Sequence, residues 1–309
     1  MRHHEIEANG VTLHFVQLGE GPAVIFCHGF PAIWSSWKAQ MEAVASAGFT
    51  AIALDMRGYG GSSAPVEADE YTPYETVGDL VAVLDAAGVP TASVVGHDFG
   101  ANVAWNAAMM RPDRFTSVCG MSVQFRPPGG PSFLDKLRAM GQTQFYMFDM
   151  IKPESDQLWA NAAVTIPAVM YWTSGEAPEG SRWDPFKPSS GFLRPAPAAS
   201  RTIDAAYIAD AVATFTRTGF HGALNYYRAI DLFTRHSAAF AGATIRQPSM
   251  FLAGTLDGFN LVAQPSPESV RTKLTDLRSF TMLEGVGHWP QLEAPDATNA
   301  ALIAFLQNL

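Results

Sequence analysis

The chain has 309 residues, of which 48% are hydrophobic and 16% charged, a balance typical of a globular protein with one large α/β domain or with a core domain that carries an insertion. Its formal net charge of −9 opposes contact with phosphate backbones and argues against a nucleic-acid partner.

Targeting and cofactor signals are absent from the sequence pattern. The first residues contain no apolar segment of a secretory signal, and no stretch reaches the roughly 18 apolar residues of a membrane-spanning helix. Cys27 and Cys119 lie in apolar runs, which favours packing over disulfide or metal chemistry. We therefore expect a cytoplasmic monomer or homodimer with no cofactor, no metal and no membrane contact.

Short apolar runs alternate with helical patterns in the first part of the chain, which predicts a mostly parallel central sheet flanked by helices. Asn9 and Gly10 predict a tight hairpin turn between two alternating segments. Strands are expected at residues 23–27, 50–54, 92–95 and 116–123, and helices around residues 37–44, 76–87 and 103–107.

The pattern changes at the Arg-Pro-Pro-Gly-Gly-Pro segment of residues 126–131. From there to residue 244 it indicates helices and loops without a convincing strand, and residues 176–200 are rich in Pro, Gly, Ala and Ser, as in an extended loop. This stretch is too long for an ordinary connection, so we interpret it as a helical cap. The predicted core comprises residues 1–125 and 245–309, with strands at 249–253 and 278–283 and a last helix at 296–306, and the cap comprises residues 126–244.

The main chemical signal is Gly-His-Asp-Phe-Gly at residues 96–100. A strand that turns sharply into a helix exposes one side chain, and glycines two residues away on either side relieve the crowding. Serine is usual at the centre of such a turn, but here the residue is Asp98. A carboxylate attacks an sp³ carbon and forms an alkyl ester, which water must then cleave. An Asp that merely caps the helix is the simpler alternative.

Ester cleavage needs a general base and a group that orients it. His288 follows the final predicted strand, in the chain order nucleophile, acid, histidine, and Asp257 follows the strand before it. We expect two backbone N–H groups, those of Phe30 and Phe99, to bind the oxyanion of ester hydrolysis.

Four further side chains are expected to line the substrate pocket, because they lie in the loops next to these groups: His28, Pro31, Trp34 and Trp289. A hydrogen bond that braces its own loop is the more ordinary role for His28.

Several motifs together resemble the α/β-hydrolase-type epoxide hydrolases, particularly the plant enzymes and their bacterial relatives. They are His-Gly-Phe-Pro at 28–31, Asp-Met-Arg-Gly-Tyr-Gly at 55–60, the motif at 96–100, the segment at 219–228, and Gly-His-Trp-Pro-Gln at 287–291. The resemblance spans nearly the whole chain and is weakest across residues 176–200. It implies an enzyme that converts small organic epoxides to vicinal diols with water.

In that family, two tyrosines of the cap bind the epoxide oxygen and donate a proton as the ring opens. The resemblance assigns these roles to Tyr146 and Tyr227, with Tyr226 as the substitute if the register differs by one residue. A phenol, with a reference pKa near 10, keeps its proton at neutral pH.

Two other functions remain open on the same fold. A haloalkane dehalogenase uses the same nucleophile, but such enzymes carry Trp directly after it, where this chain has Phe99; Trp34 or Trp37 would then have to bind the halide. A catalytically silent binding protein usually loses the nucleophile or the base, and this chain keeps both.

Overall fold

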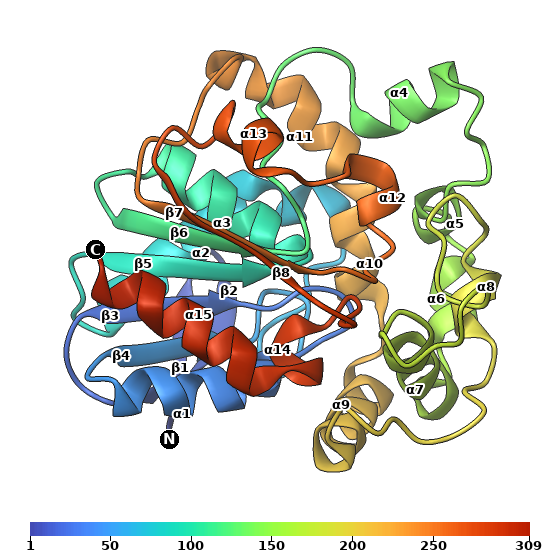
Figure 1. Ribbon diagram of the computed structural model, residues 1–309, viewed down its shortest axis with the longest axis horizontal. Helices are drawn as coiled ribbons and strands as arrows, with labels where there is room; N and C mark the ends of the chain where they lie inside the picture. Colours follow the sequence, from blue (N-terminus) through green and yellow to red (C-terminus); the bar gives the residue numbers. More distant parts are fainter.

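A sheet of eight strands forms the centre of the computed structural model, which describes residues 1–309 with the side chain of residue 190 excepted (Figure 1). The strand order is β1-β2-β4-β3-β5-β6-β7-β8, and every pairing is parallel except those of β1 with β2 and of β2 with β4. The strands are β1 (Arg2–Ala8), β2 (Val11–Leu18), β3 (Ala23–Cys27), β4 (Thr50–Leu54), β5 (Ala92–His97), β6 (Phe115–Met121), β7 (Ser249–Gly254) and β8 (Leu277–Leu283).

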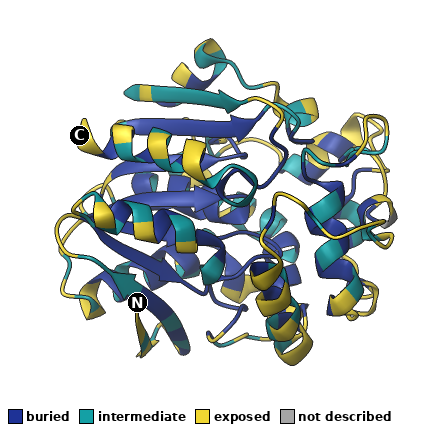
Figure 2. Ribbon diagram, turned by 60° about the horizontal axis from the view of Figure 1, so that its bottom comes forward, coloured by how far each residue is buried: buried dark blue, intermediate teal, exposed yellow. Residues whose placement is uncertain are grey.

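Helices cover both faces of this sheet. Helices α1 (Lys38–Ser46) and α15 (Pro295–Gln307) pack together on one face, and α2 (Pro73–Ala86) and α3 (Phe99–Met110) lie on the other. Parallel strands that are buried on both faces read as continuous apolar runs. All five residues of β3 and of β4 are accordingly buried (Figure 2).

The predicted positions of these elements agree with the structure. Residues 23–27 and 50–54 form strands with the expected bounds, and the hairpin is closed by Asn9 and Gly10, with φ of 50° and 74°. Positive φ at both central residues is the hairpin geometry that matches the twist of the strands. The mostly parallel sheet flanked by helices is thus confirmed.

Between β6 and β7 the described residues form helices joined by loops, without a strand. The helices are α4 (Phe133–Ala139), α5 (Met147–Met150), α6 (Ser155–Trp159), α7 (Ala162–Trp172), α8 (Ser190–Leu193), α9 (Ala205–Thr218), α10 (His221–Arg228), α11 (Ile230–His236) and the 3₁₀ turn η3 (Ser237–Phe240). Helices α5 to α9 lie beyond the carboxyl ends of the parallel strands, at the right of Figure 1. This path supports a division into core and cap, which stays a prediction at the boundaries 125/126 and 244/245.

Residues 176–200, expected as an extended loop, contain the short helix α8 and close on themselves. The carboxylate of Glu176 accepts hydrogen bonds from the Ser200 hydroxyl (2.7 Å) and from the N–H of Arg201 (2.8 Å), so the two ends of the segment meet. Burial raises the pKa of Glu176, but hydrogen bonds from Thr202, Arg201 and Ser200 outweigh it and lower this pKa to about 2.

The remaining short elements connect the core. They are the 3₁₀ turns η1 (Trp34–Trp37) and η2 (Ala68–Tyr71) and the helices α12 (Asn260–Ala263), α13 (Pro267–Arg271) and α14 (Pro290–Glu293). No helix is long and apolar enough to cross a membrane, and among the described residues no group of His, Cys, Asp or Glu is arranged to hold a metal ion.

A buried ion pair fixes the core loop that contacts the segment between β6 and β7. The Arg57 guanidinium donates two hydrogen bonds of 2.6 Å to Asp79 on α2, and both side chains are almost fully buried. The backbone carbonyl of Arg57 accepts a hydrogen bond from the Tyr226 hydroxyl on α10 at 3.1 Å. Removal of either partner would leave an uncompensated buried charge, so the pair favours one position of the Arg57 loop. Because the carbonyl of Arg57 contacts Tyr226, this also fixes the loop relative to α10.

Candidate active site

Asp98 occupies the turn from β5 into α3, and its backbone has φ of 54° and ψ of −119°. This conformation is strained for a residue with a side chain and persists only where the surroundings fix it. The neighbouring glycines are required, because a Cβ on Gly96 would lie 2.0 Å from the carbonyl oxygen of Gly100, and a Cβ on Gly100 would lie 2.0 Å from that of Cys27. The turn therefore presents the Asp98 carboxylate at the carboxyl edge of the sheet.

The two oxygens of Asp98 have different partners. Oδ1 accepts a hydrogen bond of 2.9 Å from the N–H of Phe30, and Oδ2 lies 3.6 Å from Nε2 of His288. The carboxylate makes no capping hydrogen bond to α3, so it does not have the ordinary role of Asp at a helix start. Phe99, as the first residue of α3, has an N–H without an acceptor in its own helix.

The structure brings Asp98, Asp257 and His288 together from the ends of three strands. Nδ1 of His288 lies 3.2 Å from both carboxylate oxygens of Asp257. Oδ1 of Asp257 also accepts the N–H of Phe259 at 2.9 Å, which fixes the carboxylate. The histidine is thus held between two carboxylates, one at each ring nitrogen.

The backbone of His288 is fixed on both sides. Its carbonyl oxygen accepts hydrogen bonds from Nε2 of His97 at 2.6 Å and from the Ser122 hydroxyl at 3.2 Å, and its N–H donates to the carbonyl of Thr173 at 2.9 Å. His97 therefore does not line the narrow pocket, and it fixes the backbone of His288. Burial, reinforced by the nearby charge of His288, lowers the pKa of His97 to about 3, so this ring stays neutral.

Glu293 is a further support that the sequence pattern did not indicate. Its carboxylate accepts the N–H groups of Gly287 (3.0 Å), Trp289 (2.9 Å) and Gly175 (2.8 Å). The first two flank His288, and the third follows helix α7. The Glu293 carboxylate thus connects the loop of His288 to the segment between β6 and β7.

Tyr146 and Tyr227 both line the narrow pocket that contains Asp98 and His288. Their ring centres are 6.0 Å apart at an angle of 86°, and the backbone N–H of Tyr146 donates to the carbonyl of Pro185 at 2.9 Å. Both side chains are almost fully buried, which raises the pKa of each phenol well above its ordinary value of 10. These phenols therefore keep their protons at neutral pH.

Tyr226, the alternative in the register, has a different position. Its hydroxyl is engaged with the carbonyl of Arg57, and its ring packs between those of Tyr59 and Tyr71 at centre distances of 5.5 and 5.3 Å. The geometry therefore favours Tyr227 over Tyr226 as the tyrosine of the narrow pocket.

Several walls of this pocket come from residues that the sequence pattern did not single out. Trp183 and Phe192 belong to the segment at 176–200, and Phe259 follows Asp257. The ring of Trp183 stands edge-on to Phe259 and Tyr146 at 5.0 and 5.2 Å. Composition suggested only a loop here, and no local pattern reveals that a loop closes over a distant site.

Of the four residues expected to line the substrate pocket, one lines it and three do not. Trp289 lines the narrow pocket, as does the side chain of Phe30. His28 is fully buried and braces its loop, accepting the N–H of Met56 at Nε2 (3.1 Å), the ordinary role considered for it.

Trp34 packs against His3 and His14 at ring distances of 5.3 and 6.5 Å, away from the site. Pro31 is buried beside Phe30 but is not among the residues that line either cavity. Position next to a motif therefore did not establish which way these side chains point.

The charges of the site depend on one another. Burial lowers the pKa of His288, but the carboxylates of Asp257 and Asp98 outweigh this effect and raise it to about 10. Burial raises the pKa of Asp98, but the adjacent His288 and the Phe30 N–H hold it below its usual range. The resting site thus contains an ionised Asp98 carboxylate next to a protonated His288 imidazole.

Known proteins resemble the chain over its whole length. A family model described as alpha/beta hydrolase fold matches residues 22–295. An epoxide hydrolase of Caballeronia sordidicola is 48% identical, with 100% of this chain and 94% of that protein covered. Epoxide hydrolase A of Mycobacterium tuberculosis is 34% identical, with 98% and 97% covered.

Solved structures agree with these sequence relatives. The crystal structure of epoxide hydrolase A from Mycobacterium thermoresistibile superposes with a TM-score of 0.92 and 35% identity, and the match covers 100% of this chain and 98% of that one. The family resemblance noted in the sequence motifs is therefore confirmed, and the chain belongs to the epoxide hydrolases of the α/β hydrolase fold family.

Proposed function

We propose that this enzyme hydrolyses organic epoxides to vicinal diols through a covalent ester on Asp98. The observation that carries the proposal is the convergence of a buried carboxylate, a histidine and two protonated phenols, those of Tyr146 and Tyr227, on one pocket. A carboxylate can open an epoxide only if the departing oxygen receives a proton, and the phenols can supply it.

In the first step, a carboxylate oxygen of Asp98 attacks an epoxide carbon. The ring C–O bond breaks, and its oxygen takes a proton from Tyr146 or Tyr227 while the other phenol donates a hydrogen bond. The product is a neutral alkyl ester with a free hydroxyl on the adjacent carbon. A positioned acid of this kind typically contributes about 10²–10⁴-fold to the rate.

Ester formation also changes the charge state of His288. Its pKa is raised to about 10 by two carboxylates, and conversion of Asp98 to a neutral ester removes one of them. The pKa of the imidazole then falls, and the proton it releases restores the phenol. His288 becomes a base only after the nucleophile has reacted, so the order of the two steps is built into the electrostatics of the site.

In the second step, neutral His288 takes a proton from water, and the resulting hydroxide attacks the ester carbonyl carbon. The N–H groups of Phe30 and Phe99 would bind the oxyanion; the former already donates to Oδ1 of Asp98 at 2.9 Å. Collapse releases the diol, which takes its proton from His288. The carboxylic acid left on Asp98 then returns its proton to the imidazole, and the resting state is restored.

A haloalkane dehalogenase is the alternative function, but neither tryptophan expected to bind its halide, Trp34 or Trp37, lines the narrow pocket. Trp37 is buried against Phe26 on the far face of the sheet, with ring centres 5.3 Å apart, and Trp34 lies away from the site. Trp183 does line the narrow pocket, and its indole nitrogen has no hydrogen-bond partner. Because the Trp183 indole could bind a halide, halide release should be measured together with diol formation. A silent binding protein is disfavoured by the intact triad.

The function is tested by turnover of styrene oxide, cyclohexene oxide and a terminal alkyl epoxide, in parallel with bromoalkanes of matched length. The enzyme is expected to form diol and to release no halide, because the two phenols fit an epoxide oxygen. Asp98→Ala should abolish diol formation, while the exposed surface variant Asp69→Ala should behave as the wild type. Halide release without diol would contradict the proposal.

Replacement of the phenols should slow ring opening. Tyr146→Phe and Tyr227→Phe are each expected to lower the rate of Asp98 alkylation by about tenfold or more, and the double variant by about 10²–10⁴-fold, because each removes a hydrogen bond to the departing oxygen. Stopped-flow measurement of ester formation gives these rates. Tyr171→Phe, a tyrosine of α7 outside both cavities, is the matched control. Wild-type alkylation in the double variant would exclude the phenols as acids.

The raised pKa of His288 has a consequence for stability. The folded protein holds this proton more tightly than the unfolded chain, so the contribution is complete below the reference pKa of about 6.5 and is lost as pH rises toward about 10. The unfolding free energy of the wild type minus that of His288→Gln should therefore fall across this range, by up to about 1.4 kcal/mol per pH unit. Urea unfolding at several pH values measures it, and a difference that stays flat or grows would refute a protonated resting His288.

A further inference from the structure

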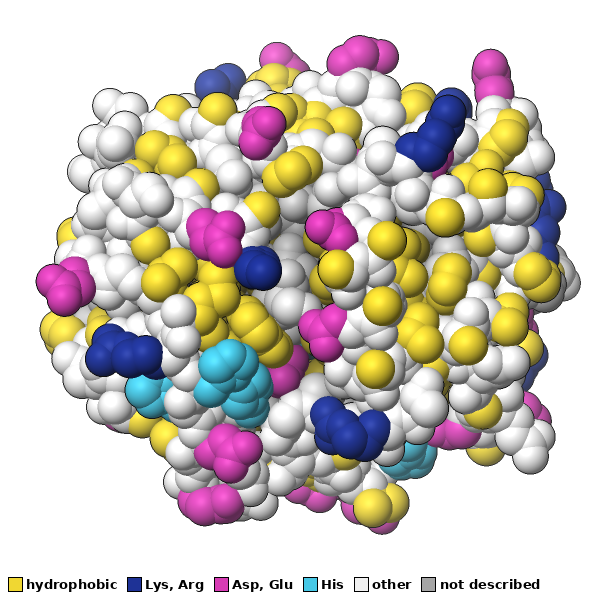
Figure 3. All heavy atoms as spheres, turned by 90° about the horizontal axis from the view of Figure 1, so that it is seen from below, with side chains coloured by type: hydrophobic (Ala, Val, Ile, Leu, Met, Phe, Trp, Pro, Cys, Tyr) yellow, Lys and Arg dark blue, Asp and Glu magenta, His cyan; other side chains and the backbone are white. Residues whose placement is uncertain are grey.

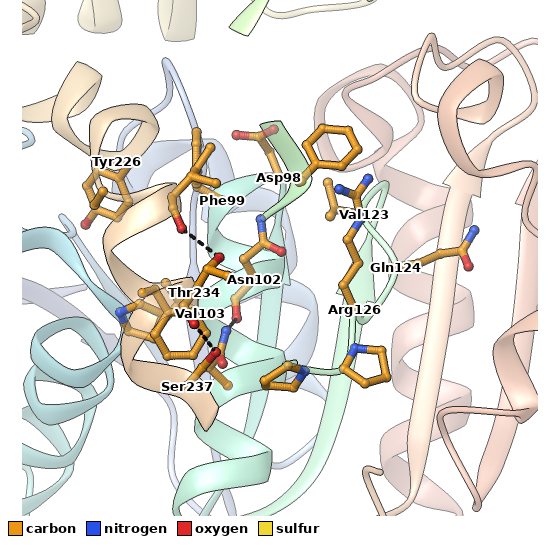
Figure 4. Close-up of a pocket in the computed structure, with 18 of the residues that line it drawn as sticks. Asp98, Phe99, Asn102, Val103, Val123, Gln124, Arg126, Tyr226, Thr234 and Ser237 are labelled. Atoms are coloured by element: carbon orange, nitrogen blue, oxygen red, sulfur yellow. Dashed lines mark hydrogen bonds between the residues drawn. The ribbon is translucent and has the colours of Figure 1, made fainter. Parts of the chain in front are cut away.

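Asp98 lies where two cavities of unequal size meet. The larger cavity has a volume of about 530 Å³, and in Figure 4 Asp98 lies at the upper end of the side chains that line it. The narrow pocket that contains Tyr146 and Tyr227 has a volume of about 20 Å³, little more than the space of one water molecule. Asp98 and Phe259 line both spaces. Room for a substrate is therefore available on one side of Asp98 and is almost absent on the other.

The proposed reaction fixes how an epoxide must lie between these two spaces. Its oxygen has to reach the phenols of Tyr146 and Tyr227, and Asp98 has to approach a ring carbon from the side opposite the C–O bond that breaks. The plane of the three-membered ring then has one face toward the larger cavity and the other toward the remaining walls of the narrow pocket. A substituent on the first face enters the larger cavity, whereas a substituent on the second face meets those walls.

The indole of Trp183 forms one of these walls. The walls of the narrow pocket include the apolar side chains of Val169, Trp183 and Phe192. The ring of Trp183 stands edge-on to those of Tyr146 and His288, with ring centres 5.2 and 5.6 Å apart. The ring of Phe192 packs edge-on to that of Trp183 at 6.0 Å and supports it from behind. Trp183 is thus in contact with groups on both sides of the place where the epoxide ring would lie.

A glycine makes room for this indole. Gly258 directly follows Asp257, and a Cβ at position 258 would lie 2.7 Å from Cε3 of Trp183 and 2.8 Å from its carbonyl oxygen. The close approach of Trp183 to this loop therefore requires glycine at position 258. Phe259 packs edge-on to the indole at 5.0 Å, and the backbone N–H of Trp183 donates to the carbonyl of Trp172 at 3.0 Å. The indole is thus held in the pocket by backbone and side-chain contacts.

Selection at this wall is one of shape. The indole nitrogen of Trp183 has no hydrogen-bond partner in the protein, so replacement of the side chain enlarges the narrow pocket without breaking a hydrogen bond. On the face shown in Figure 3, Lys and Arg side chains are scattered among Asp and Glu, so this face has no patch of one charge that would select a charged substrate. In an apolar pocket, one carbon atom changes discrimination between substrates by about 10- to 200-fold.

We propose that Trp183 is a specificity-determining residue, which blocks one face of the epoxide ring and makes the enzyme prefer epoxides whose substituents all lie on the other face. Terminal, cis-disubstituted and ring-fused epoxides meet this requirement. A trans-1,2-disubstituted epoxide does not, because it carries one substituent on each face of the ring. This inference rests on the proposed epoxide hydrolysis and specifies which epoxides the site accepts.

The test compares cis- and trans-1-phenylpropylene oxide, which contain the same atoms and differ only in the face that carries the methyl group. The wild type should favour the cis isomer in kcat/KM by about 10- to 200-fold. Trp183→Ala should bring the cis-to-trans ratio close to one through a rise in kcat/KM for the trans isomer, which general damage to the fold would not produce. Trp183→Phe leaves a smaller ring at the wall and should give an intermediate ratio.

Phe186→Ala is the matched control. Phe186 belongs to the same segment as Trp183, packs against Phe145 with ring centres 5.4 Å apart, and lies outside both cavities. Its replacement should leave the cis-to-trans ratio at the wild-type value. A wild-type ratio near one, a wild-type ratio in both Trp183 variants, or an equal change in Phe186→Ala would overturn the inference.

A binding measurement separates failure of this inference from failure of the proposed function. Asp98→Asn keeps the shape of the site and removes the carboxylate, so calorimetric titration of this variant with the two isomers reports binding without turnover. Tighter binding of the cis isomer that is lost when Trp183→Ala is added supports the role of Trp183 even if the wild type hydrolyses no epoxide. Equal binding of both isomers, with a wild type that readily hydrolyses styrene oxide, would leave the reaction intact and exclude this role.

Discussion

The site depends on the cost of keeping the Asp98 carboxylate ionised in a buried position. A buried charge must be paired and hydrogen-bonded, or it is neutralised. Here the protonated His288 lies 3.6 Å from one oxygen, and the Phe30 N–H donates to the other. In the proposed mechanism, the same pairing makes the carboxylate available as a nucleophile and prevents the histidine from acting early as a base. Pairing and catalytic order thus follow from a single interaction.

The surrounding fold holds Asp98 and His288 next to each other. The strained turn at Asp98 requires glycines at positions 96 and 100, because backbone atoms occupy the space that a Cβ would need. The loop of His288 is fixed by His97 and Ser122 from the core and by Glu293, which also binds the N–H of Gly175. The segment between β6 and β7 carries Tyr146 and Tyr227, so its attachment through Glu293 helps to hold the two phenols in the pocket of Asp98, as the proposed mechanism requires.

Much of the core could be predicted from the sequence because its signals are local. Buried parallel strands produce continuous apolar runs, and the elbow at residues 96–100 requires its glycines. Asp98, Asp257 and His288 were identifiable because each follows a strand, and the structure brings all three together. The assignment of Tyr146 and Tyr227 came from family resemblance, and both line the pocket.

Other features have no local signature. Trp183 lines the pocket from within residues 176–200, and Glu293 accepts the N–H of Gly175, 118 positions away in the chain. His28 and Trp34 were expected to line the pocket, but His28 braces its own loop and Trp34 packs against His3. Position in a loop does not determine the direction of a side chain.

The central claim is that an oxygen of Asp98, and not one taken directly from water, forms the new C–O bond. A single turnover in water enriched in ¹⁸O, with enzyme in excess over styrene oxide, tests this claim most directly. The account predicts a first-turnover diol without ¹⁸O and one labelled oxygen in the peptide that contains Asp98, because water attacks the ester carbonyl carbon. Labelled diol in the first turnover, with an unlabelled Asp98, would mean that water opens the epoxide directly and would contradict the account.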